Sequence, residues 1–220
     1  MIIYIGENLR KGSDTMRKIK PWYLCIAALM LVCGLTGCGG NEGEDVAEAD
    51  LPYGATLITD SQCGEVPVTY DRRFISPEEA EALSGYFYAL ETMDEELLDK
   101  YTPDIYTDFV IEALYQDLLG MDGLVVDMNS SFAAEENVPY EIKEVEIKSF
   151  YTNDDEESTD LANLYNMLSE LSGEENFAAR ITDGKFITYD IRTDTNGTVK
   201  LFEDQTLFLI KLDGEYVVCS

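Results

Sequence analysis

The sequence predicts an α+β fold in which helices come first and an antiparallel sheet closes the domain. Helix-start signals occur at Ser76-Pro77, at Asp94 and at Thr102-Pro103, all of them before any long run of β-branched residues. Asn196-Gly197 and Asp213-Gly214 separate β-rich runs near the end of the chain. Such dipeptides are the strongest short-range signals of β-hairpins.

The N-terminal region has the organisation of an export signal. The basic stretch 16–20 precedes an apolar run from Trp22 to Cys33, and small residues follow up to Cys38. This order of charge, apolar core and small residues is typical of a secretory signal. The apolar run has 12 residues, whereas a membrane-spanning helix needs about 20, so a retained transmembrane helix is disfavoured. Residues 1–15 fit no signal peptide, which indicates a start codon assigned too far upstream.

The end of this signal, Leu35-Thr36-Gly37-Cys38, resembles the lipobox of bacterial lipoproteins. The resemblance implies that residues 16–37 are removed and that Cys38 carries a diacylglyceryl group as the mature N-terminus. The expected partner is then the lipid bilayer, with the protein lipid-anchored on the extracytoplasmic face of the cell membrane. The alternative is an ordinary cleaved signal in which Cys38 is incidental.

The mature chain is strongly acidic. Without residues 1–37 it has 183 residues, with 42 acidic and 10 basic side chains and a formal charge of −32. Such a chain repels polyanions, so nucleic acid is excluded as a partner. Residues 38–54 are rich in glycine, alanine and acid and predict a lipidated, flexible tether, and residues 55–220 predict one α+β domain.

The elements expected within the domain follow from periodicity and turn signals. They are an extended stretch at about 63–70, helices starting at Ser76 and Asp94, a third helix from about 104 to 119, a strand at 140–151, an acidic loop at 153–157, an amphipathic helix at about 159–171, and strands at 185–193, 199–212 and 215–219. Residues 123–139 show no clear pattern.

This order of elements, with the ending from Leu209 to Tyr216, resembles the NTF2-like fold and the last hairpin of NTF2-like bacterial lipoproteins. The resemblance covers about residues 76–219 and implies a cone, in which a bent antiparallel sheet wraps the N-terminal helices. A generic α+β domain of another topology is the alternative. The fold serves isomerases, dehydratases, transport factors and domains without known activity, so it leaves function open.

The residue types present exclude several chemistries. The sequence contains no histidine, which removes the usual catalytic dyads and histidine metal sites. Cys63 and Cys219 are the only thiols outside the signal and the lipobox, which is too few for a common zinc site. These two form either a disulfide between the start of the domain and its last strand or two independent thiols. We expect no metal and no cofactor.

One catalytic arrangement comes from the NTF2-like resemblance, because enzymes of that fold commonly use an aspartate near tyrosine or histidine. Asp190, Tyr189 and Tyr165 would then meet inside the cone. The favoured interpretation is an exposed acid and two tyrosines at the edge of the core, since a chain this acidic places a carboxylate near every site.

Calcium is the strongest metal alternative. Five residues, Asp194, Asn196, Gly197, Val199 and Glu203, have the spacing of an EF-hand loop. The first loop position, however, is Arg192, and the flanking segments predict strands rather than helices. The sequence therefore favours a hairpin turn at this place.

Two classes of function remain. The favoured one is a non-catalytic domain that binds a small ligand, a wall component or a partner protein, and the rival is an isomerase- or dehydratase-type enzyme with a buried carboxylate. Ten aromatic side chains are candidates for a pocket at the mouth of a cone, although a core position is favoured for most: Tyr86, Phe87, Tyr88, Phe109, Tyr115, Phe150, Phe186, Tyr189, Phe202 and Phe208.

Overall fold

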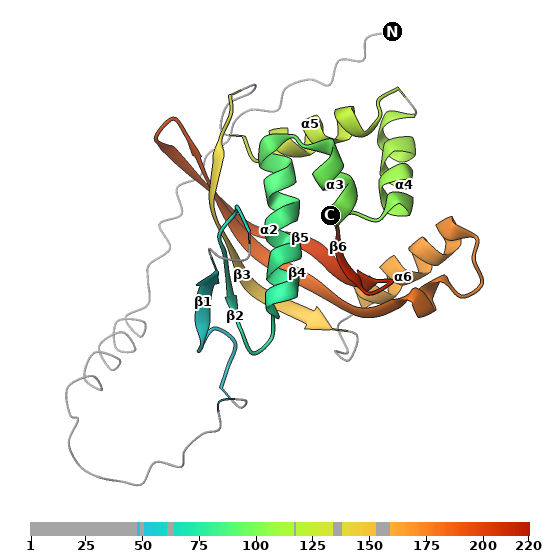
Figure 1. Cartoon of the computed structure of the whole chain (residues 1–220), viewed down its shortest axis with the longest axis horizontal. Coiled ribbons are helices and arrows are strands. Elements are labelled where there is room, and N and C mark those ends of the chain that lie inside the picture. Colours follow the sequence, from blue (N-terminus) through green and yellow to red (C-terminus); the bar gives the residue numbers. More distant parts are fainter. Residues whose placement is uncertain (1–47, 49–50, 61–63, 117, 134–137, 153–158) are drawn as a thin grey trace, which may run out of the picture. The chain divides into compact units, whose positions relative to one another are not determined.

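A computed structural model describes residues 48, 51–60, 64–116, 118–133, 138–152 and 159–220. Within these residues the chain forms a mixed α+β domain with a six-stranded sheet and five α-helices, which confirms the predicted class (Figure 1). The signal segment, Cys38 and Cys63 lie outside the described residues.

The strands follow one another across the sheet in the order β1-β2-β3-β4-β5-β6. Their bounds are β1 Leu57–Asp60, β2 Val68–Asp71, β3 Glu141–Thr152, β4 Ile181–Thr195, β5 Thr198–Leu212 and β6 Glu215–Cys219. The long strands curve beneath α2 (Pro77–Thr92) in Figure 1, and the pairs β3–β4 and β4–β5 each contain two irregularities of register. Bulges of this kind bend a strand and increase its twist.

The expectation of a purely antiparallel sheet was wrong at one pair. β2 and β3 run parallel, with Val68 opposite Val145 and Thr69 opposite Glu146. A parallel pair needs a long crossover connection, and here the connection contains four helices. The sheet is therefore mixed.

Four helices, rather than three, precede the first long strand. After α2 come α3 (Glu95–Tyr101), α4 (Asp104–Tyr115) and α5 (Met121–Ser131). The third helix ends at Tyr115 instead of Leu119, because Gln116 has the left-handed conformation (φ 50°) that terminates it. The helix α5 lies where the sequence showed no clear pattern.

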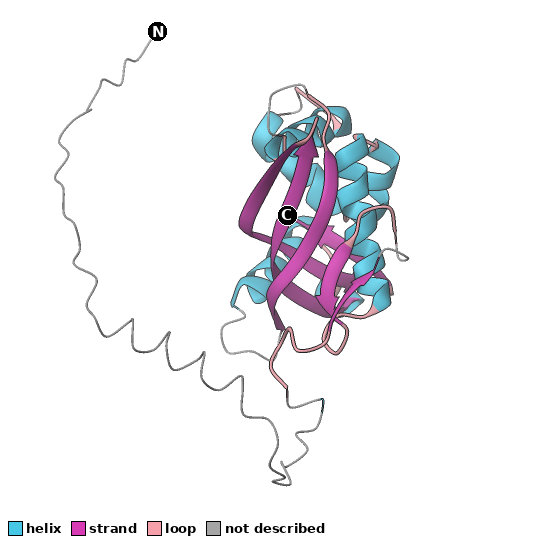
Figure 2. Ribbon diagram, turned by 90° about the vertical axis from the view of Figure 1, so that its left-hand side faces the viewer, coloured by secondary structure: helices cyan, strands magenta, loops and turns pink. Residues whose placement is uncertain are grey.

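Different helices pack against the two faces of the sheet. Residues opposite one another on paired strands point to the same face, so Ile187 and Leu207 lie in the large cluster beneath α2. Gly184 and Ile210 point the other way, toward α6 (Thr159–Ser172) and the 3₁₀ helix η2 (Phe177–Arg180). Figure 2 shows most of the helices stacked on one face of the sheet.

The folded unit begins before the predicted boundary at residue 55. The Tyr53 hydroxyl donates to the Ile147 carbonyl at 3.1 Å, and its ring lies 5.7 Å from those of Phe74 and Phe150. The Gly54 amide donates to the buried carboxylate of Asp71 at 2.9 Å. Tyr53 and Gly54, assigned to the tether from composition, are thus packed parts of the domain.

Asp71 is the centre of a polar cluster that fastens this first segment. It accepts from Thr56 Oγ1 at 2.6 Å and from two guanidinium nitrogens of Arg73, whose third guanidinium nitrogen donates to the carbonyl of Leu51 at 2.8 Å. The hydrogen bonds from Arg73 hold the pKa of Asp71 well below its usual range. The segment 51–57 is therefore attached to β2 through a charged pair.

Both predicted hairpins are confirmed. Asn196 and Gly197 have φ of 52° and 87° and connect β4 to β5, and Asp213 and Gly214 have φ of 52° and 92° and connect β5 to β6. Two successive residues with positive φ give the turn whose twist matches that of paired strands.

Candidate functional site

The structure does not bring the predicted catalytic residues together. Tyr189 and Asp190 are neighbours on β4, so they point to opposite faces of the sheet. Tyr189 is buried in the cluster beneath α2, whereas Asp190 lies 3.7 Å from the ammonium of Lys148 and accepts from the Asp204 amide at 2.9 Å. Tyr165 on α6 packs in the second cluster. The favoured interpretation was therefore wrong in part, because Asp190 is partly buried rather than exposed and Tyr189 lies in the core rather than at its edge.

Aromatic side chains fill the space between α2 and the sheet. The ring of Phe87 is 5.2 Å from Tyr86, 5.2 Å from Tyr189 and 6.4 Å from Phe132, with each pair edge to face. Burial raises the pKa of Tyr189 well above its usual range, so its hydroxyl stays protonated. No carboxylate is paired with it among the described residues. This interior is a packed core.

The residues considered for calcium form the hairpin that the sequence favoured. The Asp194 carboxylate accepts from the Gly197 amide at 2.7 Å, which is a turn interaction. In the part of the chain that is described, no three acidic or cysteine side chains gather as a metal site.

Cys219 is fully buried on β6, and burial raises the pKa of its thiol. It forms no disulfide with any described residue. Because Cys63 is not among the described residues, the bridge between these two cysteines stays a prediction. The lipid attachment at Cys38 likewise stays a prediction. None of the described helices is long and apolar enough to cross a bilayer.

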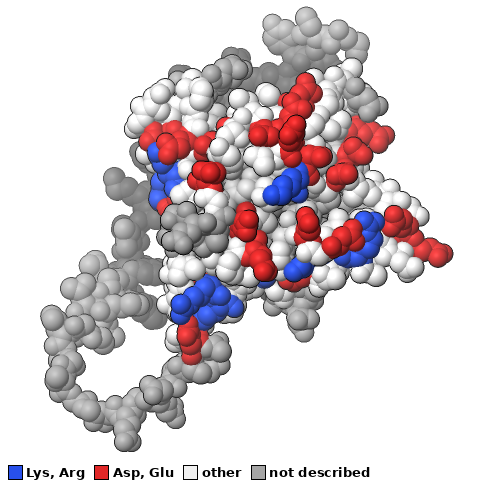
Figure 3. Space-filling view, viewed as in Figure 1, with Lys and Arg blue, Asp and Glu red and all other residues white. Residues whose placement is uncertain are grey.

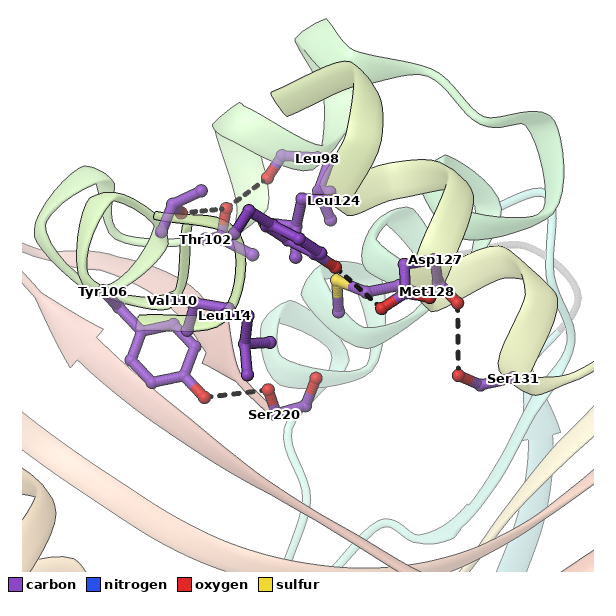
Figure 4. Close-up of a pocket in the computed structure, with 12 residues that line it drawn as sticks. Leu98, Thr102, Tyr106, Val110, Leu114, Leu124, Asp127, Met128, Ser131 and Ser220 are labelled. Carbon is purple, nitrogen blue, oxygen red and sulfur yellow. Dashed lines mark hydrogen bonds between the residues drawn. The ribbon is translucent and has the colours of Figure 1, made fainter. Parts of the chain in front are cut away.

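A small pocket lies between α3, α4 and α5, outside the predicted cone interior (Figure 4). Its volume is about 120 Å³. Its apolar lining comes from all three helices and consists of Leu98, Val110, Leu114, Leu124 and Met128.

Helix geometry explains why α4 faces this pocket. Tyr106, Val110 and Leu114 are spaced four residues apart, so they form one stripe along the helix. On α5, Leu124 and Met128 have the same spacing and line the opposite side. Leu124 is buried, whereas 65 % of Leu114 is exposed. The pocket is therefore apolar at its base and open on the Leu114 side.

Hydroxyl groups surround the base of the pocket, and each has an acceptor within the protein. Thr102 donates to the Leu98 carbonyl at 2.7 Å, and Tyr106 donates to the main-chain oxygen of Ser220 at 2.8 Å (Figure 4). Thr107 donates to the Pro103 carbonyl at 3.2 Å. Burial raises the pKa of Tyr106 to about 12. These groups hold the walls in place, and none of them is a base at neutral pH.

One carboxylate borders the pocket. Tyr115 at the end of α4 donates to Asp127 Oδ2 on α5 at 2.7 Å, and burial together with this bond raises the pKa of Tyr115 to about 12. The bond joins the two helices across the mouth. Asp127 is exposed and, among the described residues, lies in no ion pair.

The helices around the pocket carry uncompensated negative charge. We call residues 94–131 the helical block. It contains ten acidic residues and one basic residue, Lys100. Every ion pair between described residues involves acids outside the block, on the sheet, α2, the segment before β1, or the loop and turn beside α6. Figure 3 shows acidic side chains spread over this part of the surface with few basic ones beside them.

The sequence did not predict this pocket because α5, which forms one of its walls, was not predicted. The signal was weak but present: Leu124, Val125 and Met128 have helical spacing, and Gly120 precedes the helix. Glycines at 120 and 123 within this stretch lower its helix propensity.

Comparisons with family models, curated proteins and solved structures found no match to this chain.

Proposed function

We propose that this protein is a lipid-anchored, extracytoplasmic lipoprotein whose NTF2-like domain is a non-catalytic interaction module. The anchor rests on the resemblance of residues 35–38 to a lipobox and on the export-signal pattern before it. The NTF2-like assignment rests on the order of elements and on long strands that curve around α2. The expected partner in the membrane is the bilayer itself, through the diacylglyceryl group on Cys38.

The packed interior is the observation that carries the non-catalytic assignment. Enzymes of the rival type need a cavity inside the cone with a buried carboxylate beside hydroxyl groups. Here Phe87, Tyr189 and their aromatic neighbours occupy that space. The carboxylate of Asp190 lies on the opposite face of β4.

A fragment-binding experiment by NMR tests this assignment. We expect small apolar fragments to shift signals of the helical block, such as the methyl groups of Leu114, Leu124 and Met128, and to leave those around Tyr189 unchanged. Fragments that shift Tyr189 and Ile191 instead would support the isomerase- or dehydratase-type enzyme.

A separate experiment tests the anchor. Cys38→Ala is expected to release the chain from bacterial membranes and to abolish incorporation of a labelled fatty acid. Unchanged membrane association without any acyl modification by mass spectrometry would refute the lipid anchor.

A further inference from the structure

We propose that the pocket of the helical block, with Leu114 at its open side, docks a cationic amphipathic segment of a partner protein that inserts one apolar side chain. This inference deepens the proposed function, since it names the partner class of the interaction module. It depends on the described residues alone and not on the anchor.

The size of the pocket selects the kind of occupant. Sites for small molecules are typically about 300–1,000 Å³, whereas a buried cavity of about 150 Å³ holds a single benzene ring. A pocket of about 120 Å³ therefore accepts one aliphatic or aromatic side chain. A side chain inserted from a larger surface is the usual form of an interface anchor.

Further apolar side chains are exposed in the segment that follows α4. Leu114 is 65 % exposed and lines the pocket, and Leu118 and Leu119, which follow it between α4 and α5, are 83 % and 46 % exposed. Exposed apolar groups that lie together mark interaction sites in soluble domains. An apolar face of a partner segment would cover these leucines while its anchor fills the pocket.

The negative charge around the pocket indicates that the partner segment is positively charged. Among its described residues the block has nine acidic side chains against Lys100, and Asp127 borders the pocket mouth without an ion pair to any of the described residues. A second copy of this chain would bring the same negative field against itself, and anionic lipid headgroups would be repelled. Lysine or arginine beside the apolar anchor would meet these carboxylates.

The test uses the full chain in phosphatidylcholine nanodiscs and a fluorescent probe peptide of about 15 residues with leucines on one helical face and lysines on the other. Two matched probes replace either the lysines with glutamate or the leucines with serine, and empty nanodiscs give the background. We expect the lysine–leucine peptide to bind at least about tenfold more tightly than either matched probe, because each of these probes lacks one of the two interactions.

Variants locate the binding. Leu114→Asp is expected to weaken binding of the lysine–leucine peptide about tenfold, and Leu201→Asp, at an exposed leucine on β5, less than twofold. Asp127→Asn is expected to weaken it about threefold at low salt and less at high salt, whereas Asp160→Asn on α6 has no effect. Since Leu114 is exposed, the substitution leaves the fold intact, which circular dichroism verifies.

Four results would overturn the proposal: equal binding of the glutamate probe, equal effects of Leu114→Asp and Leu201→Asp, tight binding of the serine probe, or a dimer of the unliganded chain that Leu114→Asp dissolves. The last result would assign the surface to a second copy. If the chain fails to enter nanodiscs, the anchor is refuted, and the same titration with the chain in solution still decides the docking.

Discussion

Helices α2 and α4 illustrate the contrast between two regions of this molecule. α2 buries nine of its 16 side chains against the sheet, whereas α4 buries only Thr107 of its 12, although α4 has the more apolar sequence. The charges differ in the same way. Several acids of the sheet region, such as Asp71 and Glu144, are paired with arginine, whereas no described acid of the helical block is in an ion pair.

This contrast separates the part of the domain that supports the fold from the part that is available for binding. When the neighbouring elements leave part of a helix's apolar surface exposed, binding of a partner that covers this part is favourable. Unpaired like charges oppose compactness within the block and attract a partner of opposite sign. The sheet region with α2 would then be the scaffold, and the helical block the interaction surface.

The largest effect is expected at the buried ion pair of the scaffold. Lys185 on β4 donates to the Glu79 carboxylate near the start of α2, and both are buried. Lys185→Met leaves the buried Glu79 carboxylate without a neighbouring cation and should lower the free energy of unfolding by about 3–5 kcal/mol. Lys148→Met, which removes the more exposed pairs with Glu146 and Asp190, should cost less than about 1 kcal/mol in urea unfolding. Equal losses would remove the distinction between buried and exposed pairs.

A slightly smaller loss is expected at Asp71. Asp71→Asn removes the charged hydrogen bonds from Arg73 and should lower the free energy of unfolding by about 3 kcal/mol at pH 7. The exposed matched change Asp213→Asn should have little effect.

The pH dependence follows from the depressed pKa of Asp71. Because the folded state holds this pKa below its unfolded value, the stabilisation is present above about pH 4 and is lost as the pH falls below it. Wild type should therefore lose more stability than Asp71→Asn between pH 5 and pH 2 in thermal unfolding. Parallel curves for the two proteins would show that Asp71 does not carry this dependence.

In the helical block, a charge reversal should increase stability. Asp104, Asp108 and Glu112 lie four residues apart on α4, so Asp108 faces like charge on both sides. Asp108→Lys converts two repulsions into attractions and should raise the free energy of unfolding by about 0.4–1 kcal/mol at low salt. Asp160→Lys on α6, which has no charged residue three or four positions further along, is the control. A gain that survives molar salt would point to a cause other than charge.

The smallest effect is expected at the exposed leucines. Leu118→Ser should change the free energy of unfolding by less than about 0.5 kcal/mol, since 83 % of the side chain is exposed. Leu98→Ala, at a fully buried position of the same block, should cost about 2–5 kcal/mol in the same denaturation experiment. A large loss for Leu118→Ser would mean that this leucine supports the fold and is not free to bind.

Local signals predicted local structure well. Ser76 and Glu79 form both hydrogen bonds of the expected capping box, and Asp94 caps α3 through the Leu97 amide. These interactions join residues three apart, so the sequence alone contains all their parts. Side chains alternate between the two faces of a strand, so adjacent residues 189 and 190 cannot point to the same face of β4. The catalytic hypothesis could therefore have been rejected from the sequence alone.

Contacts between distant residues could not be predicted in the same way. Glu79 and Lys185 are 106 positions apart, and nothing near either residue in the sequence indicates the other. The pocket is likewise formed by residues from Leu98 to Ser220. The parallel pairing of β2 with β3 depends on the path of the four helices between them.

The sequence by itself thus determined the α+β class, the helix starts, the two closing hairpins and the acidic charge, because each depends on neighbours along the chain or on composition alone. The tertiary structure decided which face each side chain joined: it filled the interior beneath α2 with aromatic rings and left the apolar stripe of α4 partly uncovered. The physical reason is that burial depends on how much surface the packed neighbours can cover, and α4 carries more apolar surface than α3, α5 and α6 bury.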